Sequence, residues 1–250
     1  MHNLGHTRSA NRRDHLLHTP DAFVRSPLPG LARGMVIVHV SAAAGAAFTQ
    51  YTAEIEPGGT LEPADTQRFV YVVSGEIDLA TEFAFRSLAP AGYAYLPAGS
   101  TFLITARTAA RIVVIEKPYQ PVMSTTESAE VAAPAMLIGS EPDVVSTALN
   151  GDPDLQVRAL LPAAPAFDFA VNTMTYAPGA ALSQVEVHVM EHGLLMLEGG
   201  GIYRLGDAWY PVTAGDVIWM APFCPQWFGA LGKQPAKYLI YKDWNRHPLG

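Results

Sequence analysis

The segment EVHVMEHGLLMLEGG, residues 186–200, places three metal-competent side chains directly before a glycine-rich turn. Glu186 and His188 are two residues apart, so in an extended strand both side chains leave the same face. In a continuous strand His192 would lie about 13 Å from His188, too far to share an ion. The sequence therefore predicts a turn between the two histidines, at Met190-Glu191.

Gln226 adds a fourth oxygen or nitrogen donor 34 residues after His192. It closes Pro222–Gln226, where two prolines stiffen a loop that can return the amide oxygen to the same point. Taken singly, each histidine is more commonly a hydrogen-bonded core or surface residue than a ligand. Two imidazoles, a carboxylate and an amide oxygen together suit Mn, Fe(II), Co, Ni or Zn, because no thiolate is among them. Around an octahedral ion this set would leave two positions for water or substrate, which favours a working site.

Composition and charge limit the classes of function. The chain has 250 residues, 49% of them hydrophobic, which is enough for one large domain or two of about 120 residues. The formal net charge of −7 argues against nucleic acid as a partner, because phosphate binding needs a concentrated basic surface. No apolar segment of about 18 residues is present, so we expect no membrane span.

Two further features indicate the compartment. Met1 to Leu28 lacks the apolar run of a secretory signal, and we interpret this basic-leaning stretch as a packing arm. Cys224 is the single cysteine, which excludes an intramolecular disulfide and fits a reducing, cytoplasmic setting. Its place two residues before Gln226 is compatible with a nucleophile or ligand, but we predict a buried structural thiol, because no adjacent base is visible to lower its pKa.

Short β-rich runs separated by 21 glycines and 20 prolines predict an all-β barrel or sandwich. Only Asp143–Leu149 has a helical pattern. The predicted strands are Met35–Val40, Phe48–Ile55, Phe69–Val73, Ile112–Glu116, Phe169–Tyr176, Gly193–Leu197, Val217–Met220 and Tyr238–Tyr241.

Turn positions repeat along the chain at a nearly constant distance, which predicts duplicated domains. The matching pairs, 123 to 125 residues apart, are Ser74-Gly75 with Glu198-Gly199, Ala91-Gly92 with Ala214-Gly215, Thr101-Phe102 with Gln226-Trp227, and Glu116-Lys117 with Tyr241-Lys242. We therefore predict an N-terminal arm at 1–34, a first barrel at 35–120, a connector at 121–153 and a second barrel at 154–250.

The two copies differ at the proposed ligands. The counterparts of Glu186, His188, His192 and Gln226 in the first copy are Glu62, Ala64, Arg68 and Thr101. Three of the four ligand types are lost, so we predict that the first barrel is metal-free and the second binds the metal.

This layout resembles the cupin superfamily in its duplicated, bicupin form. The usual cupin pattern has two histidines one residue apart, then a glutamate, and a histidine in a second motif. Here a glutamate comes first (Glu186), a histidine third (His192) and a glutamine last (Gln226), which is similar to the (S)-ureidoglycine aminohydrolases of purine and allantoin breakdown. The stretches that carry this similarity are LGHTRS (4–9), FVRSPLPG (23–30), EVHVMEHG (186–193), GIYRLG (201–206), WYPV (209–212), GDVIWMAP (215–222) and YKDWNR (241–246).

The resemblance implies two tandem cupin barrels, of double-stranded β-helix or jelly-roll type, assembled as a homo-oligomer. It implies Mn²⁺ held by Glu186, His188, His192 and Gln226, with Fe, Ni, Co or Zn as other candidates. It also implies that Tyr203, Tyr238 and Lys242 bind the substrate and that Glu186, Lys242 and Tyr238 act in catalysis.

The residues themselves support part of this assignment. Tyr238 and Lys242 have equal parity in a predicted strand, so both can face into a barrel. A lysine at a strand end is normally just solvated, and Tyr203 alone could be a half-buried strand residue. Inside a metal pocket, a lysine would instead neutralise a substrate carboxylate and a tyrosine hydroxyl would orient an amino or ureido group.

The expected reaction replaces the amine of a small ureido acid by a hydroxyl, with release of ammonia. Direct displacement and an imine route both remain open. Two alternatives also remain: a bicupin metalloenzyme of another type, such as an oxalate decarboxylase-like enzyme or a dioxygenase, and a non-catalytic bicupin that binds a small ligand.

Overall fold

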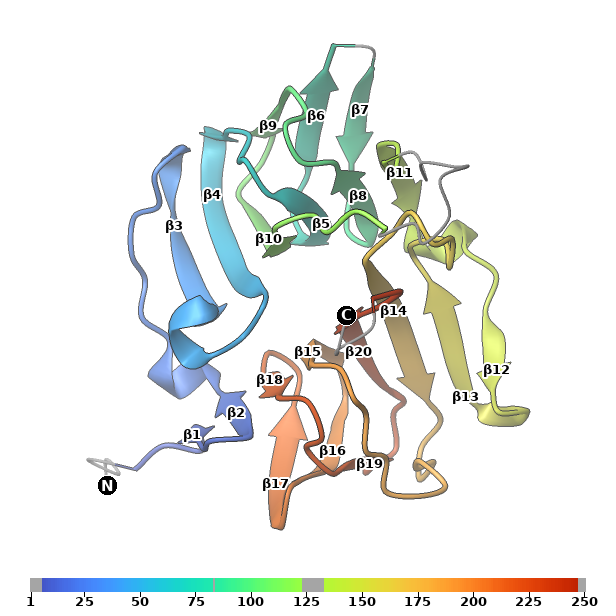
Figure 1. Ribbon diagram of the computed structural model, residues 1–250. Coiled ribbons are helices and arrows are strands. Elements are labelled where there is room, and N and C mark those ends of the chain that lie inside the picture. Colours follow the sequence, from blue (N-terminus) through green and yellow to red (C-terminus); the bar gives the residue numbers. More distant parts are fainter. Residues whose placement is uncertain (1–5, 83, 123–132, 247–250) are drawn as a thin grey trace. The chain divides into compact units, whose positions relative to one another are not determined.

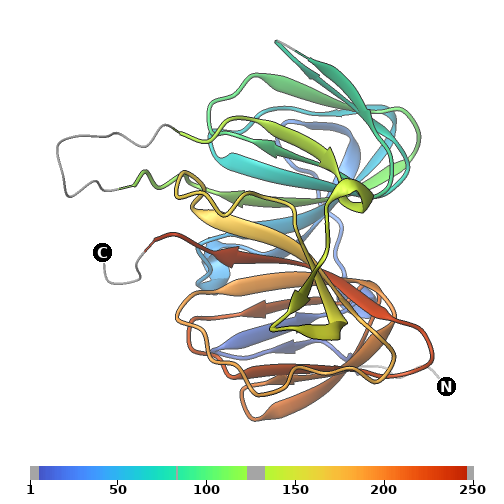
Figure 2. The same cartoon turned by 90° about the vertical axis from the view of Figure 1, so that its right-hand side faces the viewer.

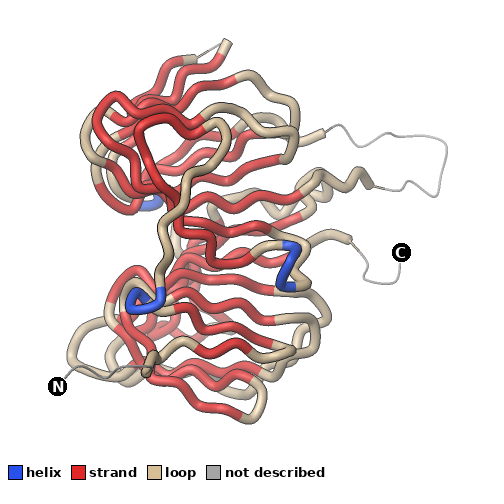
Figure 3. Tube along the Cα trace, turned by 90° about the vertical axis from the view of Figure 1, so that its left-hand side faces the viewer, coloured by secondary structure: helices blue, strands red, loops and turns tan. Residues whose placement is uncertain are grey.

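The computed structural model describes residues 6–82, 84–122 and 133–246, and nearly all of its regular structure is β-strand (Figure 1, Figure 3). The helices in this part of the chain are three 3-10 turns, Pro20–Ala22, Ala42–Ala44 and Glu141–Asp143. The all-β prediction is confirmed. Within the described ranges, no helix has the length and apolar character needed to cross a membrane.

The chain forms two compact units. The N-terminal barrel consists of Val24–Val145 and Leu160–Asp168, and the C-terminal barrel consists of Met1–Phe23, Ser146–Ala159 and Phe169–Gly250. Residues 6–23 therefore belong to the C-terminal barrel, and the division near residue 145 lies inside the segment that the sequence suggested as a connector.

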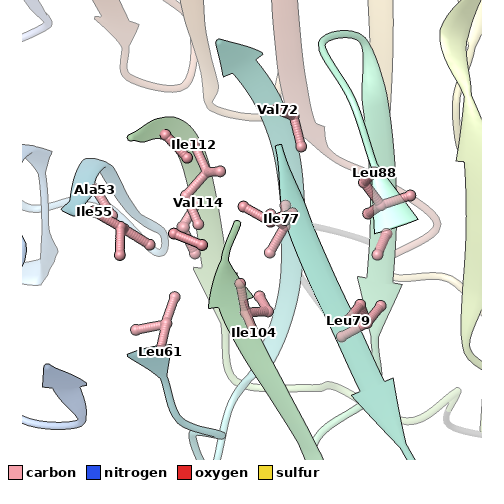
Figure 4. Packing of buried hydrophobic residues seen from close by; sticks show 14 of the residues in the cluster. Ala53, Ile55, Leu61, Val72, Ile77, Leu79, Leu88, Ile104, Ile112 and Val114 are labelled. Atoms are coloured by element: carbon pink, nitrogen blue, oxygen red, sulfur yellow. The ribbon is translucent and has the colours of Figure 1, made fainter. Parts of the chain in front are cut away.

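The N-terminal barrel is an antiparallel sheet with the order β11-β8-β5-β10-β4-β9-β6-β7, with β3 also paired to β4. Alternate residues of these strands point into one apolar core, in which Ile112 and Val114 of β10 lie near Ile77 of β6 (Figure 4). The strands are β3 Leu31–Val40, β4 Thr49–Leu61, β5 Gln67–Ser74, β6 Ile77–Thr81, β7 Phe85–Leu88, β8 Gly92–Leu96, β9 Phe102–Ala106, β10 Ala110–Lys117 and β11 Leu137–Ser140.

The C-terminal barrel combines an eight-stranded sheet, β1-β2-β18-β15-β20-β14-β13-β12, with a three-stranded sheet, β17-β16-β19. Strand β2, near the amino-terminal end, pairs antiparallel with β18, so His15–His18 is a sheet strand of this barrel (Figure 2). The strands are β1 Ala10–Asn11, β2 His15–His18, β12 Thr147–Leu149, β13 Asp152–Ala159, β14 Phe169–Tyr176, β15 His192–Glu198, β16 Gly200–Leu205, β17 Ala208–Thr213, β18 Val217–Met220, β19 Gln226–Ala230 and β20 Ala236–Asp243.

The duplication is visible at equivalent turns. Gly75 and Gly199 both have positive φ, 76° and 64°, and a Cβ on either would overlap the backbone oxygen of the residue directly before the neighbouring strand. The pairs β5–β10 and β15–β20 also carry a β-bulge at the same place. When the two barrels are aligned at this bulge, Lys242 corresponds to Glu116, which lies 126 residues earlier (242 − 116). The sequence comparison had matched Lys242 with Lys117, one residue away.

The predicted helix at Asp143–Leu149 is wrong. Its first residue ends the 3-10 turn Glu141–Asp143, and Thr147–Leu149 is strand β12. Asn150 and Gly151 follow with φ of 52° and 83°, the backbone of a two-residue hairpin turn that joins β12 to β13. The Asn-Gly pair is a hairpin signal, and it outweighs the weak helical pattern before it.

Candidate functional site

Two backbone hydrogen bonds fix the start of the proposed ligand segment. Glu186 N–H donates to Gln226 O at 2.8 Å, and Gln226 N–H donates to Glu186 O at 2.9 Å. The chain then bends at Val189–Met190, one residue earlier than the predicted turn at Met190-Glu191. β15 begins directly afterwards at His192. The bend returns His192 to the residues before it.

The four predicted ligands lie in one cluster. The ring centroids of His188 and His192 are 4.6 Å apart, and His188 Nδ1 lies 2.9 Å from His192 Nε2. His188 Nδ1 is also 3.3 Å from Gln226 Nε2, and His188 Nε2 is 3.5 Å from a carboxylate oxygen of Glu186. His188 thus faces Glu186 with one ring nitrogen and the other two side chains with the second.

The electrostatics of the cluster favour neutral imidazoles. Burial lowers the pKa of His192 to about 3, and the charges of His188 and Lys242 act in the same direction. Burial also lowers the pKa of His188, against the effect of the Glu186 carboxylate. His192 Nδ1 lies 3.1 Å from Met190 O, so Nδ1 carries the proton and Nε2 turns its lone pair towards the cluster. A neutral imidazole held by such an outer hydrogen bond is the form that binds a metal ion, and the donor set fits a divalent cation.

The orientation of the Gln226 amide is set by its neighbours. The Tyr203 hydroxyl donates to Gln226 Oε1 at 3.1 Å, which leaves the amide nitrogen towards His188. Turning the amide by 180° exchanges the two atoms, so that the oxygen faces the cluster and the amide nitrogen donates to the Tyr203 oxygen. In both orientations the Tyr203 hydroxyl has a hydrogen-bond partner. In the second orientation the amide also presents an oxygen donor to a cation.

Lys242 lies directly across the strand pair from His192. Burial lowers its pKa, while the Glu186 carboxylate acts in the opposite direction. Its Nζ lies 5.3 Å from the ring centroid of Trp244. Tyr238, four residues earlier on the same face of β20, belongs to the core of the C-terminal barrel. This face of the strand therefore carries two of the three predicted substrate-binding residues, and the third, Tyr203, lies on β16.

Tyr176 is a neighbour of the site that the sequence did not reveal. Its hydroxyl lies 2.7 Å from that of Tyr238, and both side chains are buried. Tyr176 ends a correctly predicted strand, but the sequence does not show that β14 pairs with β20.

Burial raises the pKa of Tyr203 and of Tyr238 well above the usual value, so both hydroxyls stay protonated near neutral pH.

The equivalent place in the N-terminal barrel holds an ion pair. Arg68 and Glu116 are cross-strand partners in β5 and β10, the relation that His192 and Lys242 have in β15 and β20. An Arg68 nitrogen lies 2.6 Å from Glu116 Oε1, and the Tyr51 hydroxyl donates to the same oxygen at 2.8 Å. A guanidinium thus lies at the position that corresponds to His192, and that this barrel is metal-free stays a prediction.

A second group of metal-competent side chains lies elsewhere in the C-terminal barrel. One donor atom each from Asp14, His15 and Cys224 lie within 4.8 Å of one another. Cys224 is buried as predicted, and burial together with Asp14 raises the pKa of its thiol to about 11. The sequence could not indicate this group, because Asp14 and Cys224 are 210 residues apart (224 − 14).

Comparison with known families identifies both barrels. A cupin domain model matches residues 172–241, and an EutQ-like cupin domain model matches residues 42–119. The predicted fold of two tandem cupin barrels is confirmed.

Comparison with individual proteins extends over almost the whole chain. The (S)-ureidoglycine aminohydrolase of Arabidopsis thaliana is 42% identical over 98% of this chain and 80% of its own length. The (S)-ureidoglycine aminohydrolase of Escherichia coli is 30% identical over 92% of this chain and 88% of its own. The crystal structure of protein Ylba from E. coli has a TM-score of 0.84 at 27% identity and 96% coverage of both chains. This chain therefore belongs to the (S)-ureidoglycine aminohydrolase family and is a hydrolase enzyme with two cupin domains.

Proposed function

We propose that this enzyme converts (S)-ureidoglycine to (S)-ureidoglycolate in purine and allantoin breakdown. One water is consumed, the bond between carbon and the amine nitrogen is broken, a carbon–oxygen bond is formed, and ammonia leaves. The observation that carries the proposal is the single cluster of Glu186, His188, His192 and Gln226, with Lys242 across the strand from it. The names of the Arabidopsis and E. coli relatives support the substrate.

Glu186, His188, His192 and Gln226 are the residues that would hold Mn²⁺. The set offers nitrogen and oxygen donors without a thiolate, which also suits Fe, Ni, Co or Zn. A cation bound there supplies a Lewis acid for the substrate and lowers the pKa of a bound water.

The surrounding side chains select and orient the substrate. The Lys242 ammonium pairs with the substrate carboxylate, which offsets the cost of its own burial. The Tyr203 and Tyr238 hydroxyls, both protonated, hydrogen-bond the amino or ureido group. Glu186 Oε2 is a carboxylate acceptor inside the cluster and can take a proton from water. Contacts from separate directions would engage only one enantiomer fully, so we expect the enzyme to be stereoselective.

The direct test is ammonia release from freshly generated (S)-ureidoglycine by chelated protein to which Mn²⁺ has been restored. We expect His188→Ala and Gln226→Ala to lose metal and activity together. Full activity and full metal content in both variants would overturn the assigned centre. Anaerobic assays should give an unchanged rate, whereas a dioxygenase would stop. Tight binding without ammonia release would instead identify a ligand-binding bicupin.

A further inference from the structure

Strand pairing brings Asp14, His15 and Cys224 together. β2 pairs with β18, with His15 opposite Met220. Just beyond this pair, Ala221 N–H donates to Asp14 O at 2.9 Å, and Cys224 N–H donates to Ala221 O at 3.2 Å. The start of the chain and the loop between β18 and β19 are thus joined by main-chain bonds that aim the three side chains at one place.

The spacing of the donors is close to that of a bound cation. His15 Nδ1 lies 2.9 Å from Asp14 Oδ1, and all three donors lie within 4.8 Å of one another. A tetrahedral ion bound to sulfur at about 2.3 Å and to nitrogen and oxygen at about 2.0 Å separates its donors by roughly 3.3–3.5 Å. His15 and Cys224 are buried, whereas the Asp14 side chain is 47% exposed and free to adjust.

The second ring nitrogen of His15 already has the partner that a metal-bound histidine needs. His15 Nε2 lies 2.9 Å from the Tyr210 hydroxyl, and the two rings meet edge to face at 5.5 Å. With Nδ1 on an ion, Nε2 carries the proton and donates it to the Tyr210 oxygen, which fixes the ring. A nucleophilic role for Cys224 fits less well, because His15 Nδ1 faces Asp14 and the thiol donates to Pro225 O at 3.6 Å.

We infer that Asp14, His15 and Cys224 form a second metal site that takes a thiolate-binding divalent cation such as Zn²⁺ or Co²⁺. A thiolate ligand separates this site chemically from the oxygen- and nitrogen-only cluster around His188. Three protein ligands leave a fourth position for water. When the ion binds, the thiol proton is released to solvent and sulfur binds as thiolate. The site ties the amino-terminal strand to the loop that ends at Gln226.

Co²⁺ titration of the full chain, stripped of metal under reducing conditions, tests this site. Cys224 is the only cysteine, so any thiolate-to-cobalt charge-transfer absorption reports this residue alone. We expect that band to saturate at one equivalent in His188→Ala, in which the other cluster is broken, to disappear in Cys224→Ser and to be lost or strongly reduced in Asp14→Ala. His188→Ala, which breaks the other cluster, is the matched control and should keep the band. Tyr210→Phe should keep it with about 10-fold weaker binding.

Two results would overturn the site. One is Co²⁺ binding by the unaltered protein with no charge-transfer band. The other is a band that persists at full strength and affinity in both Asp14→Ala and His15→Ala, which would place Cys224 with other ligands. A stability measurement adds an independent readout: Zn²⁺ should raise the melting temperature of His188→Ala but not of a variant that also carries Cys224→Ser.

Discussion

At the scale of single residues, Lys242 carries a positive charge across the strand pair from His192. Replacing it by methionine keeps the length and apolar stem of the side chain but removes the charge. We expect Lys242→Met to lower kcat/KM about 10- to 100-fold, the effect of losing one charged hydrogen bond of about 1.5–3 kcal/mol, mainly through KM. Steady-state kinetics and metal analysis measure both effects, and manganese content should be unchanged.

Lys237→Met is the matched control for this prediction. Lys237 lies on the same strand, and its Nζ is 3.8 Å from a carboxylate oxygen of Glu198. Its replacement should leave kcat/KM close to that of the unaltered enzyme. Loss of manganese from Lys242→Met would contradict the role given to Lys242.

The paired hydroxyls of Tyr176 and Tyr238 make a second residue-level prediction. Both side chains are buried, and Tyr238 has a further contact with Met174 Sδ at 3.3 Å. Tyr176→Phe should lower the free energy of unfolding by about 1–3 kcal/mol, because it leaves a buried hydroxyl without its oxygen partner. In a double-mutant cycle measured by urea unfolding, Tyr238→Phe should cost less in the Tyr176→Phe background than alone. Strict additivity would contradict the coupling.

The sequence predicts contacts between residues that are close along the chain, but not contacts between residues that are far apart along it. Glu186, His188 and His192 are close in the sequence, so their spacing predicted that they converge. Tyr176 lies 62 residues from Tyr238, and its contact exists only because β14 pairs with β20. The Asp14 cluster depends in the same way on the pairing of β2 with β18. Local spacing carries no information about such pairs.

At the scale of elements, the amino-terminal segment behaves as part of the C-terminal barrel. Arg8 makes two hydrogen bonds, of 2.7 and 2.8 Å, to the fully buried carboxylate of Asp216, which also accepts the Thr213 N–H. Ser9 and Thr19 join the two ends of the β1–β2 hairpin at 2.8 Å. These contacts explain why the basic-leaning start of the chain is a structural segment.

His18, at the end of β2, makes the attachment of this segment sensitive to pH. Burial lowers the pKa of His18 from 6.5, although the Ala22 carbonyl and the Asp21 carboxylate act in the opposite direction. The unfolded chain therefore binds this proton more tightly than the folded chain. The stability contributed by neutral His18 is complete above pH 6.5 and decreases as the pH falls below it.

The melting temperature should consequently fall between about pH 7.5 and about pH 5.5, and His18→Gln should reduce this fall. The comparison with the variant is necessary because His188 and His192, whose pKa values are also lowered, add to the same slope. An identical pH dependence in both proteins would exclude a contribution from His18.

The elements also show where pattern reading succeeds and fails. Phe169–Tyr176 and Val217–Met220 were predicted with the observed bounds, because Gly, Pro and polar residues flank a clear run of β-forming side chains. Thr147–Leu149 was assigned to a helix, since three residues are too short to show strand alternation. Its strand conformation comes from pairing with β13 through the Asn150-Gly151 turn.

At the scale of the whole molecule, the two cupin barrels share a fold but differ in the residues of their interiors. The Arg68–Glu116 pair in the N-terminal barrel is almost fully buried, with 4% and 16% of the side chains exposed. Removing one partner of such a pair leaves an uncompensated charge and costs about 3–5 kcal/mol, whereas replacing both by apolar residues is close to neutral. The pair therefore balances its charges internally at the position that corresponds to His192 and Lys242.

We therefore expect substitutions in the two barrels to have different effects: loss of stability in the N-terminal barrel and loss of manganese in the C-terminal barrel. Arg68→Met should lower the free energy of unfolding by about 3 kcal/mol, and the double variant Arg68→Met, Glu116→Leu should recover most of the loss. Manganese content per folded chain should stay unchanged in both variants, because the predicted ligands all lie in the C-terminal barrel. His192→Ala is the converse control and should lose manganese. Unfolding curves and metal analysis of the three proteins test the scheme, and loss of manganese from Arg68→Met would place a ligand in the N-terminal barrel.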